Sequence, residues 1–386
     1  MNNELRQALK TGVSLGLISA LRIFGLMIIV PILALHTSTF QTSIWGVGVA
    51  IGIYGLFQGL GQIPFGWLSD RIGRKQTLNI GLSFFMLGSF LASFATNIYM
   101  LIFARALQGA GAINGVLSAY AMDLTVEKYR PMVLGVIGSM IGISFFLAIS
   151  VAPILDLSIG INNIFLLMAA LVGIAIIWLN TAVPDAPIRE RQGASNYLNY
   201  IKEKPFFISV VSVFLMHGVF TSVFMLMPRY FVAQYGSSLA IMKTYVPCML
   251  ISSLVVLMFV SQFRKFQSGC YDKILPTFVA MMLGILCICY KGSMVFGLTV
   301  FIGAFGIMES ILPVYLTENV PSESRGGILG IFYMFMQLGV FTISLMVGYQ
   351  SQIWPMPVIF AFLALMILFW IAYLRMLNLR VQYAQI

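Results

Sequence analysis

Apolar residues fill most of this chain in long stretches, and short segments containing polar residues or glycine separate one stretch from the next. Each stretch is close to the roughly 20 residues that an α-helix needs to cross about 30 Å of hydrocarbon. No stretch alternates polar and apolar positions as a barrel strand would, so each predicts a helix whose backbone is hydrogen-bonded internally. We expect twelve transmembrane helices, at residues 14–35, 44–66, 76–95, 98–121, 132–153, 162–182, 206–231, 239–263, 273–291, 293–316, 326–350 and 355–377.

The composition places the whole chain in a lipid bilayer. Hydrophobic residues make up 60% of the chain and charged residues 9%, and the mean hydropathy is +0.96. Soluble domains typically contain about 25% charged residues. The first apolar stretch is too long for a removable signal peptide. The chain is therefore predicted to be an all-α polytopic membrane protein that retains its first helix.

The basic residues predict how the chain is oriented. If the N-terminus is cytoplasmic, Arg229, Lys243 and Lys291 lie on the opposite side, while Arg22 and Arg105 fall inside apolar stretches. The rest of the 22 Lys and Arg residues are then cytoplasmic, as the positive-inside rule requires. We expect a multi-pass protein of a bacterial-type inner membrane with both termini in the cytoplasm. This topology and contact with anionic lipid explain the net charge of +10, so no nucleic-acid partner is expected.

The sequence lacks the patterns that are typical of enzymes and metal proteins. Its four cysteines do not have the spacing of a zinc or redox site, and Cys287 and Cys289 would point to different faces of one helix. No paired nucleophile and base and no phosphate-binding glycine loop are present either. We expect no catalytic activity, no metal and no cofactor.

The chain contains an internal repeat. Residues 114–123 align with residues 309–318 at an offset of 195, and the same offset places Arg130 on Arg325. Pro31 and Pro228 are related by a nearly equal offset. The repeat predicts two pseudo-symmetric halves of six helices each, with residues 1–182 as the N-terminal half, 183–205 as a cytoplasmic linker and 206–386 as the C-terminal half.

A short polar segment, GWLSDRIGRK at residues 66–75, lies between the second and third apolar stretches. It meets every fixed position of G-x-L-[AS]-D-R-x-G-R-[RK], the loop signature of the major facilitator superfamily, at the place where that signature belongs. The chain therefore resembles this superfamily. The resemblance implies that two six-helix halves alternate the access to a binding site that lies between them near the bilayer midplane.

Two further motifs make the chain similar to the drug:proton antiporter branch of the superfamily. Residues 105–112 resemble the fourth-span motif R-x-x-Q-G-x-G-A, and residues 21–31 resemble the first-span motif. The fifth-span motif G-x-x-x-G-P-x-x-G-G is incomplete, since Gly138 and Gly142 are followed by Pro153 only later. The likeness covers nearly the whole chain, and we expect no soluble domain after the last apolar stretch.

The loop signature is expected to act as a conformational latch between the halves. Gly66 and Gly73 would permit its tight turn, and Arg71 and Arg74 would hold it on the cytoplasmic side. By resemblance, Asp70 would face the N-terminus of the eleventh helix, and Arg74 would pair with an acid at the end of the fourth. The helix terminus is at Gly326 and Gly327, and the acid is Asp123. The alternative is a solvated charge run that only enforces topology.

Glu309 is the one acidic residue that falls in the middle of an apolar stretch. Ionisable groups inside a membrane are costly and mark proton or substrate pathways, so Glu309 is the first candidate for proton coupling. His217, Arg22 and Arg105 are the other candidates. In the alternative, Glu309 forms a permanent pair with Arg22 or Arg105, the arginines bind an anionic substrate or knit helices through backbone carbonyls, and His217 makes an interhelical hydrogen bond.

These features predict a secondary transporter that exports lipophilic or cationic small molecules in exchange for protons. A proton-linked transporter of an organic anion is the first alternative, and a membrane receptor or scaffold that does not transport is the second. We expect a monomer whose partners are its substrate, protons and lipid. By resemblance, polar and aromatic residues of cavity-lining spans are the candidates for substrate contact: Phe24, Asn114, Gln108, Tyr120, Tyr315 and Gln337.

Overall fold

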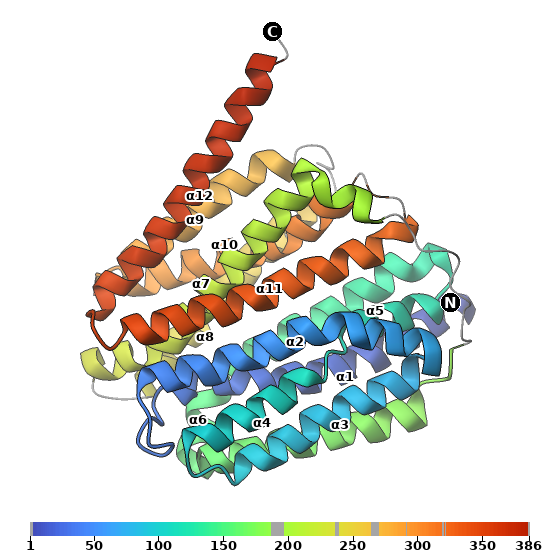
Figure 1. Cartoon of the computed structure of the whole chain (residues 1–386), viewed down its shortest axis with the longest axis horizontal. Coiled ribbons are helices and arrows are strands. Elements are labelled where there is room, and N and C mark those ends of the chain that lie inside the picture. The colour runs from blue at the N-terminus through green and yellow to red at the C-terminus, as the bar shows by residue number, and fades with distance from the viewer. Residues whose placement is uncertain are drawn as a thin grey trace.

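A computed structural model describes residues 3–186, 197–235, 239–263, 270–290, 292–318, 320 and 322–384. Long helices account for most of these residues (Figure 1). The helices of the N-terminal half are α1 (Asn3–Leu33), α2 (Ile44–Ile72), α3 (Arg74–Ser93), α4 (Ile98–Ala110), α5 (Asn114–Asp123) and α6 (Arg130–Ala182), with a 3₁₀ turn at Glu127–Tyr129.

The C-terminal half begins after a second 3₁₀ segment, Tyr197–Lys202. Its helices are α7 (Lys204–Tyr235), α8 (Leu239–Phe263), α9 (Cys270–Ile288), α10 (Met294–Thr317), α11 (Ser322–Gln350) and α12 (Met356–Ala384). Figure 1 shows two bundles, α1 to α6 in blue to green and α7 to α12 in yellow-green to red, with α2 of one beside α11 of the other where they meet. The C-terminal end of α12 leans away from the other helices and projects beyond the bundle.

The fourth expected span is broken into α4 and α5, which the sequence did not predict. Residues 111–113 between them are not helical. Gly111 lies against the backbone of Gly81 on α3, where a β-carbon would collide with the carbonyl oxygen. The carbonyl of Gly111 accepts a hydrogen bond from the Arg22 guanidinium at 3.5 Å. Irregular backbone is tolerated at membrane depth where such partners satisfy its polar groups.

The fifth and sixth expected spans are the two arms of α6. The chain bends at Gly160, which has φ 75° and ψ 163°. Glycine adopts this conformation readily, whereas other residues are strained in it. The helices continue up to the bend, so the loop that was expected between residues 153 and 162 is a tight turn. Similarly, α1 begins at Asn3 and not at residue 14.

Eight helices of the described residues are long and apolar enough by themselves to cross a membrane. One of them, the run from Glu127 to Ala182, contains two of the expected spans. Three expected spans correspond to α3, α8 and α9, and the apolar part of α8 is the shorter segment Thr244–Val256. The predicted all-helical polytopic architecture is thus present, although not every helix reaches the threshold of length and hydropathy.

The two halves meet most closely along α2 and α11. Glycines of α2 lie directly on the backbone of α11: a β-carbon on Gly48 would be 2.5 Å from the carbonyl oxygen of Ser344, and one on Gly55 would be 2.9 Å from that of Gln337. Small residues allow helix backbones to approach in this way inside a membrane. Gly52 and Gly59 continue the same contact on α2.

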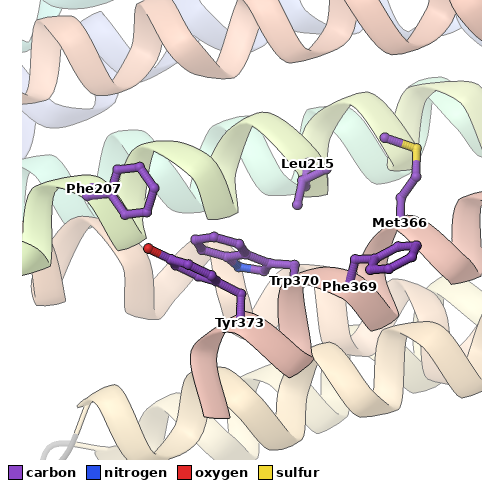
Figure 2. A pocket seen from close by; sticks show the side chains of 6 residues that line it. All are labelled: Phe207, Leu215, Met366, Phe369, Trp370 and Tyr373. Atoms are coloured by element: carbon purple, nitrogen blue, oxygen red, sulfur yellow. The ribbon is translucent and has the colours of Figure 1, made fainter. Parts of the chain in front are cut away.

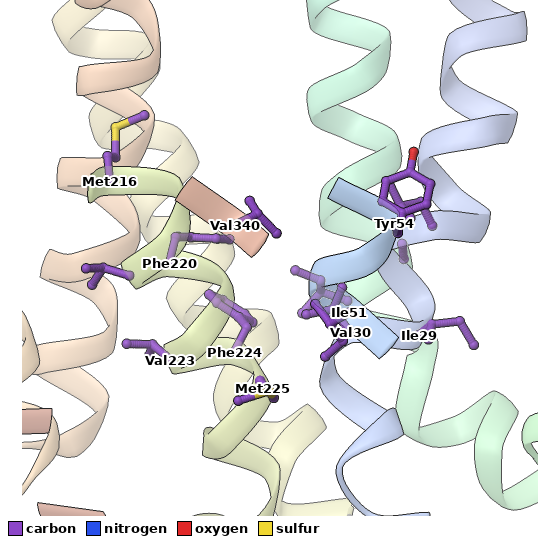
Figure 3. Packing of buried hydrophobic residues seen from close by; sticks show 14 of the residues in the cluster. Ile29, Val30, Ile51, Tyr54, Met216, Phe220, Val223, Phe224, Met225 and Val340 are labelled. Atoms are coloured by element: carbon purple, nitrogen blue, oxygen red, sulfur yellow. The ribbon is translucent and has the colours of Figure 1, made fainter. Parts of the chain in front are cut away.

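These contacts bring the halves together at one end of the molecule, which we call the hairpin end because residues 34–43 and 351–355 turn there. At this end the Gln352 amide donates to the Ser43 hydroxyl at 2.7 Å. Deeper in the bundle, Phe145 of α6 lies 5.8 Å from Phe220 of α7, measured between ring centroids. Figure 3 shows buried side chains of α7 and α11, including Phe220, opposite those of α1 and α2.

Candidate functional site

His217 of α7 and Glu309 of α10 form a hydrogen-bonded pair in the C-terminal half. His217 Nε2 lies 2.8 Å from Glu309 Oε2, so the ring N–H donates to the carboxylate. The Glu309 side chain is 45% exposed and the His217 side chain 16%. A carboxylate that is this exposed while it touches an imidazole has the components of a proton-exchange site. The two candidates that the sequence offered separately therefore form one group.

Aromatic rings surround this pair. The His217 ring meets Phe305 of α10 edge-on, with centroids 5.0 Å apart. Phe220 stacks on Phe305 at 3.8 Å and also lies near Phe145 of the other half. Aromatic faces favour cations and flat apolar groups. No motif in the sequence marks these phenylalanines, although Phe220 follows His217 by three residues and so lies on the same side of the helix.

Arg22 of α1 is held inside the N-terminal half. Its guanidinium donates to Asn114 Oδ1 of α5 at 2.7 Å and to the Tyr54 hydroxyl of α2 at 2.9 Å. The side chain is 1% exposed and lies 5.5 Å from the ring centroid of Phe85. Burial of an unpaired charge is costly, and these polar and aromatic partners offset that cost.

Arg105 of α4 is equally buried and makes a separate set of contacts. Its Nε donates to the carbonyl of Ala50 on α2 at 3.2 Å, and its Nη1 donates to Gln108 Oε1 at 2.8 Å. Gln108 in turn donates to the Ser89 hydroxyl of α3 at 2.8 Å. The guanidinium also lies 4.7 Å from the Tyr54 ring centroid. Arg105 thereby ties α2, α3 and α4 together.

The alternative in which Glu309 pairs permanently with Arg22 or Arg105 is wrong. In the described part of the chain, the hydrogen bonds of both guanidinium groups go to neutral oxygens of the N-terminal half, and the carboxylate bonds to His217. The break between α4 and α5 explains why Arg22 bonds within the N-terminal half, because the break presents the Gly111 carbonyl to its guanidinium. The alternative in which an arginine joins helices through backbone carbonyls agrees with the hydrogen bond from Arg105 on α4 to the Ala50 carbonyl on α2.

The two pairs occupy equivalent places in the two halves. Arg22 and Asn114 are 92 residues apart in sequence, and so are His217 and Glu309. The offset of 195 that relates Asn114 to Glu309 also relates Arg22 to His217. Side-chain contacts of 2.7 Å and 2.8 Å join the members of each pair. The repeat predicted from the sequence related Asn114 to Glu309. It did not include Arg22 and His217, although the same offset relates them.

Some of the residues proposed to line a substrate cavity are engaged by other protein groups, and the rest are partly or largely buried. Gln108 is buried in the network of Arg105, and the Tyr120 hydroxyl donates to the Pro184 carbonyl, just after α6, at 2.6 Å, so both side chains are engaged by protein groups. Asn114 contacts Arg22. Phe24, Tyr315 and Gln337 are partly or largely buried on α1, α10 and α11. Their contact with substrate stays a prediction.

The loop signature joins α2 to α3 through Gly73, whose φ of 92° favours glycine. Arg74 Nη1 lies 2.8 Å from Asp70 Oδ1, and Arg74 Nε lies 3.0 Å from Asp123 Oδ2. The contact between Arg74 and Asp123 that the resemblance implied is therefore present. Arg71 stacks on the ring of Trp67, with its guanidinium carbon 3.6 Å from the ring centroid.

The expected contact between Asp70 and the start of α11 stays a prediction. The side chains of residues 321–326, among them Gly326, lie outside the described residues, and Gly327 is described in the first turns of α11. No heavy atom lies within 4 Å of a β-carbon built on Gly66, so this face of α2 has room around it. Within the described ranges, no three His, Cys, Asp or Glu side chains gather to hold a metal ion.

A helical membrane bundle of two matched halves, with hydrogen-bonded polar pairs at equivalent positions, is the architecture of a secondary transporter. The Major Facilitator Superfamily model matches residues 15–290, and the chain belongs to this family. It is a multi-pass membrane transporter and not an enzyme.

Two relatives and one solved structure show how far the similarity extends. Inner membrane transport protein YajR of Escherichia coli is 30% identical over 346 residues, which cover 84% of this chain and 74% of that protein. An uncharacterized transporter of Buchnera aphidicola subsp. Baizongia pistaciae is 30% identical over 385 residues, covering 89% and 95%. The crystal structure of the nucleoside transporter NupG matches with a TM-score of 0.77 at 15% identity, over 95% of this chain and 98% of that one. This last match shows the fold alone.

Proposed function

We propose that this protein is a proton-coupled exporter of lipophilic or cationic small molecules in a bacterial inner membrane. The observation that carries the proposal is the contact of 2.8 Å between His217 and a Glu309 carboxylate that is 45% exposed. A carboxylate in this position can hold a proton or a cation, but not both at once. Competition between the two for one group is the simplest form of exchange.

The exchange proceeds in two states of Glu309. When the carboxylate is ionised, it attracts the imidazolium of His217 or the positive group of a substrate. When it takes up a proton on Oε2, both attractions are lost and the substrate is released. Phe220 and Phe305 provide the apolar and aromatic surface that a lipophilic cation requires beside its charge.

The loop signature supplies the conformational part of the cycle. Arg74 holds Asp70 and Asp123 together, and Asp70 in turn caps the start of α11 in one state of the transporter and releases it in the other. In the structure the halves are closest at the hairpin end, through α2 and α11. The signature lies at the other end of α2, where opening and closing of the cytoplasmic side would act on it.

A distant relative supports the proposed substrate class. Multidrug resistance protein 1 of Bacillus subtilis is 25% identical over 327 residues, which cover 82% of this chain and 83% of that protein. The name of YajR places that relative in the inner membrane. The cytoplasmic termini and the monomeric state that we expect complete the proposal.

Transport of an organic anion is the second candidate, because Arg22 and Arg105 leave two positive charges in the N-terminal half. Their burial weakens this candidate. Each side chain is 1% exposed, and two nitrogens of each guanidinium group donate to protein oxygens, while the Nε of Arg22 is buried without a partner among the described residues. An anion would have to displace those contacts before it could bind either guanidinium.

The proposal is tested with purified protein in proteoliposomes under an imposed pH difference. Wild-type protein should accumulate a lipophilic cation such as tetraphenylphosphonium against its gradient. Glu309→Gln keeps size and hydrogen bonding but removes the charge and the titration, so it should exchange substrate only weakly, through the apolar surface of Phe220 and Phe305, and should no longer concentrate it. Glu318→Gln, at the exposed end of the same helix, is the matched control and should behave as wild type.

Full accumulation by Glu309→Gln would contradict the proposal. Accumulation of carboxylated compounds in place of cations, lost when Arg22 or Arg105 is changed, would favour the anion transporter. Absence of any saturable flux in wild-type protein, with binding retained, would favour a receptor.

A further inference from the structure

A groove runs along the outer face of the C-terminal half between α7 and α12. Its volume is about 370 Å³, and its lining is apolar and aromatic: Phe207, Leu215, Met366, Phe369, Trp370 and Tyr373 (Figure 2). Volumes of this size accept one small-molecule ligand or one chain of a larger molecule. The groove exists because α12 leans away from the bundle toward its C-terminal end, as Figure 1 shows.

The walls of the groove are held in place by contacts among themselves. The indole N–H of Trp370 donates to the Ser212 hydroxyl at 3.0 Å, and Trp370 stacks on Tyr373 with centroids 5.5 Å apart. Phe207 packs against both rings, at 6.1 and 6.0 Å. The polar atom of Trp370 is therefore satisfied within the protein, and the groove presents ring faces to its occupant.

The groove faces away from the proposed transport site. Leu215 lines the groove, whereas His217 two residues later contacts Glu309, and residues two apart lie on nearly opposite sides of a helix. Phe369 is 69% exposed and Phe207 45%, on a surface that faces lipid in a membrane protein. The occupant thus comes from the bilayer and not from the cavity between the halves.

Positive charge lies at the end of the groove where α7 begins. Lys204 is one helical turn before Phe207, the exposed Lys202 comes just before it, and the exposed Arg375 follows Tyr373 on α12. Glu203 is exposed in the same segment, so these four side chains carry a net positive charge. Basic pockets between transmembrane helices on the cytoplasmic side bind anionic lipid head groups.

We propose that this groove is a binding site for one acyl chain of an anionic phospholipid whose head group lies at Lys202 and Lys204. The chain fills the wedge between α7 and α12, and the lysines select the head group. This site is independent of the proton pair and of the substrate that the protein transports.

The test uses Trp370 as a probe of the groove. The chain has five tryptophans, so a variant that keeps Trp370 alone is made by changing Trp45, Trp67, Trp178 and Trp354 to Phe. A second variant keeps Trp178 alone, a lipid-facing residue of α6 that serves as the matched control. Both are placed in phosphatidylcholine nanodiscs with a small fraction of brominated phosphatidylglycerol or brominated phosphatidylcholine, and fluorescence quenching is measured.

We expect Trp370 to be quenched by brominated phosphatidylglycerol at lower mole fraction than by the phosphatidylcholine analogue, and Trp178 equally by both. Loss of either lysine should weaken the preference about five-fold, since a basic residue near a membrane surface contributes about 1 kcal/mol. Glu203→Gln, the control in the same segment, should keep or strengthen it. Should the single-tryptophan variant fail to fold, the difference in quenching between wild type and Trp370→Phe gives the same answer.

Equal quenching of Trp370 by the two lipids would overturn the proposal, as would a preference that survives the change of both lysines. Relief of the quenching by tetraphenylphosphonium at transport concentrations would identify the groove as a substrate site instead. None of these outcomes depends on whether Glu309 couples transport to protons, so failure here and failure of the proposed function are distinguishable.

Discussion

His217 and Glu309 are in contact at 2.8 Å. Arg22 and Asn114 make a similar contact at the equivalent place in the N-terminal half, with different side chains. Histidine and glutamate side chains can each bind and release a proton. Neither member of the N-terminal pair can, because an arginine stays protonated and an amide does not titrate. The two halves thus keep the same geometry while one of them carries the exchangeable proton.

The first prediction concerns the loop signature. Asp70→Asn removes the charge that Arg74 contacts at 2.8 Å, so transport in proteoliposomes should fall severely, while expression and membrane insertion stay near those of wild type. Glu127→Gln, an exposed acid that follows Asp123, is the control and should leave turnover unchanged. Normal turnover of the Asp70 variant would reduce the signature to a determinant of topology.

The residues of this loop show what could be predicted from the sequence. The tight turn at Gly73 follows from the residue type, and the ion pair between Arg74 and Asp123 is the one that the resemblance to a known motif implied. The same holds for the twelve apolar stretches, because hydropathy over about 20 residues is a local property.

The partners of the buried arginines could not be predicted in this way. Arg22 and Arg105 bond to backbone carbonyls of Gly111 and Ala50 as well as to side chains, and any residue type can supply a carbonyl. Which carbonyl is free depends on the break between α4 and α5, which a close approach of two glycines determines. The stacking of Phe220 on Phe305 likewise depends on how α7 and α10 pack.

The second prediction assigns Arg105 to stability. Arg105 donates to Ala50 and Gln108 from two nitrogens of its planar guanidinium group. Arg105→Lys keeps the charge but lacks this planar group and cannot make both hydrogen bonds, so the variant should lose about 1–3 kcal/mol of stability. Thermal unfolding in detergent should show a lower midpoint, whereas pH-driven accumulation per folded molecule should stay close to wild type. Intact stability with abolished coupling would place Arg105 in the proton pathway instead.

The third prediction concerns the closed contact between α2 and α11. A β-carbon on Gly55 would lie 2.9 Å from the Gln337 carbonyl oxygen, so Gly55→Val should force the helices apart at the hairpin end. Overpacking of this kind costs about 1–3 kcal/mol in the state that contains the contact. Crosslinking of cysteines placed at Ser43 and Gln352 should become slower in this variant. Gly135→Val on α6, where a β-carbon has open space and which lies outside the loop signature, is the control and should not change that rate.

The last prediction replaces a residue of one pair by the type of residue found at the equivalent position of the other half. His217→Arg would place a permanent guanidinium beside Glu309, as Arg22 lies beside Asn114, and an opposite charge this close holds a carboxylate ionised. The variant should fold and bind lipophilic cations weakly, because the arginine now occupies the carboxylate, and it should not accumulate them when a pH difference is imposed.

The reverse change, Asn114→Asp, gives Arg22 a carboxylate that it keeps ionised, so it should add no second coupled proton. The number of protons exchanged per substrate, measured from the reversal potential in proteoliposomes, should therefore be the same for Asn114→Asp and wild type. An increased number in that variant, or normal accumulation by His217→Arg, would show that the proton does not travel through the pair of His217 and Glu309.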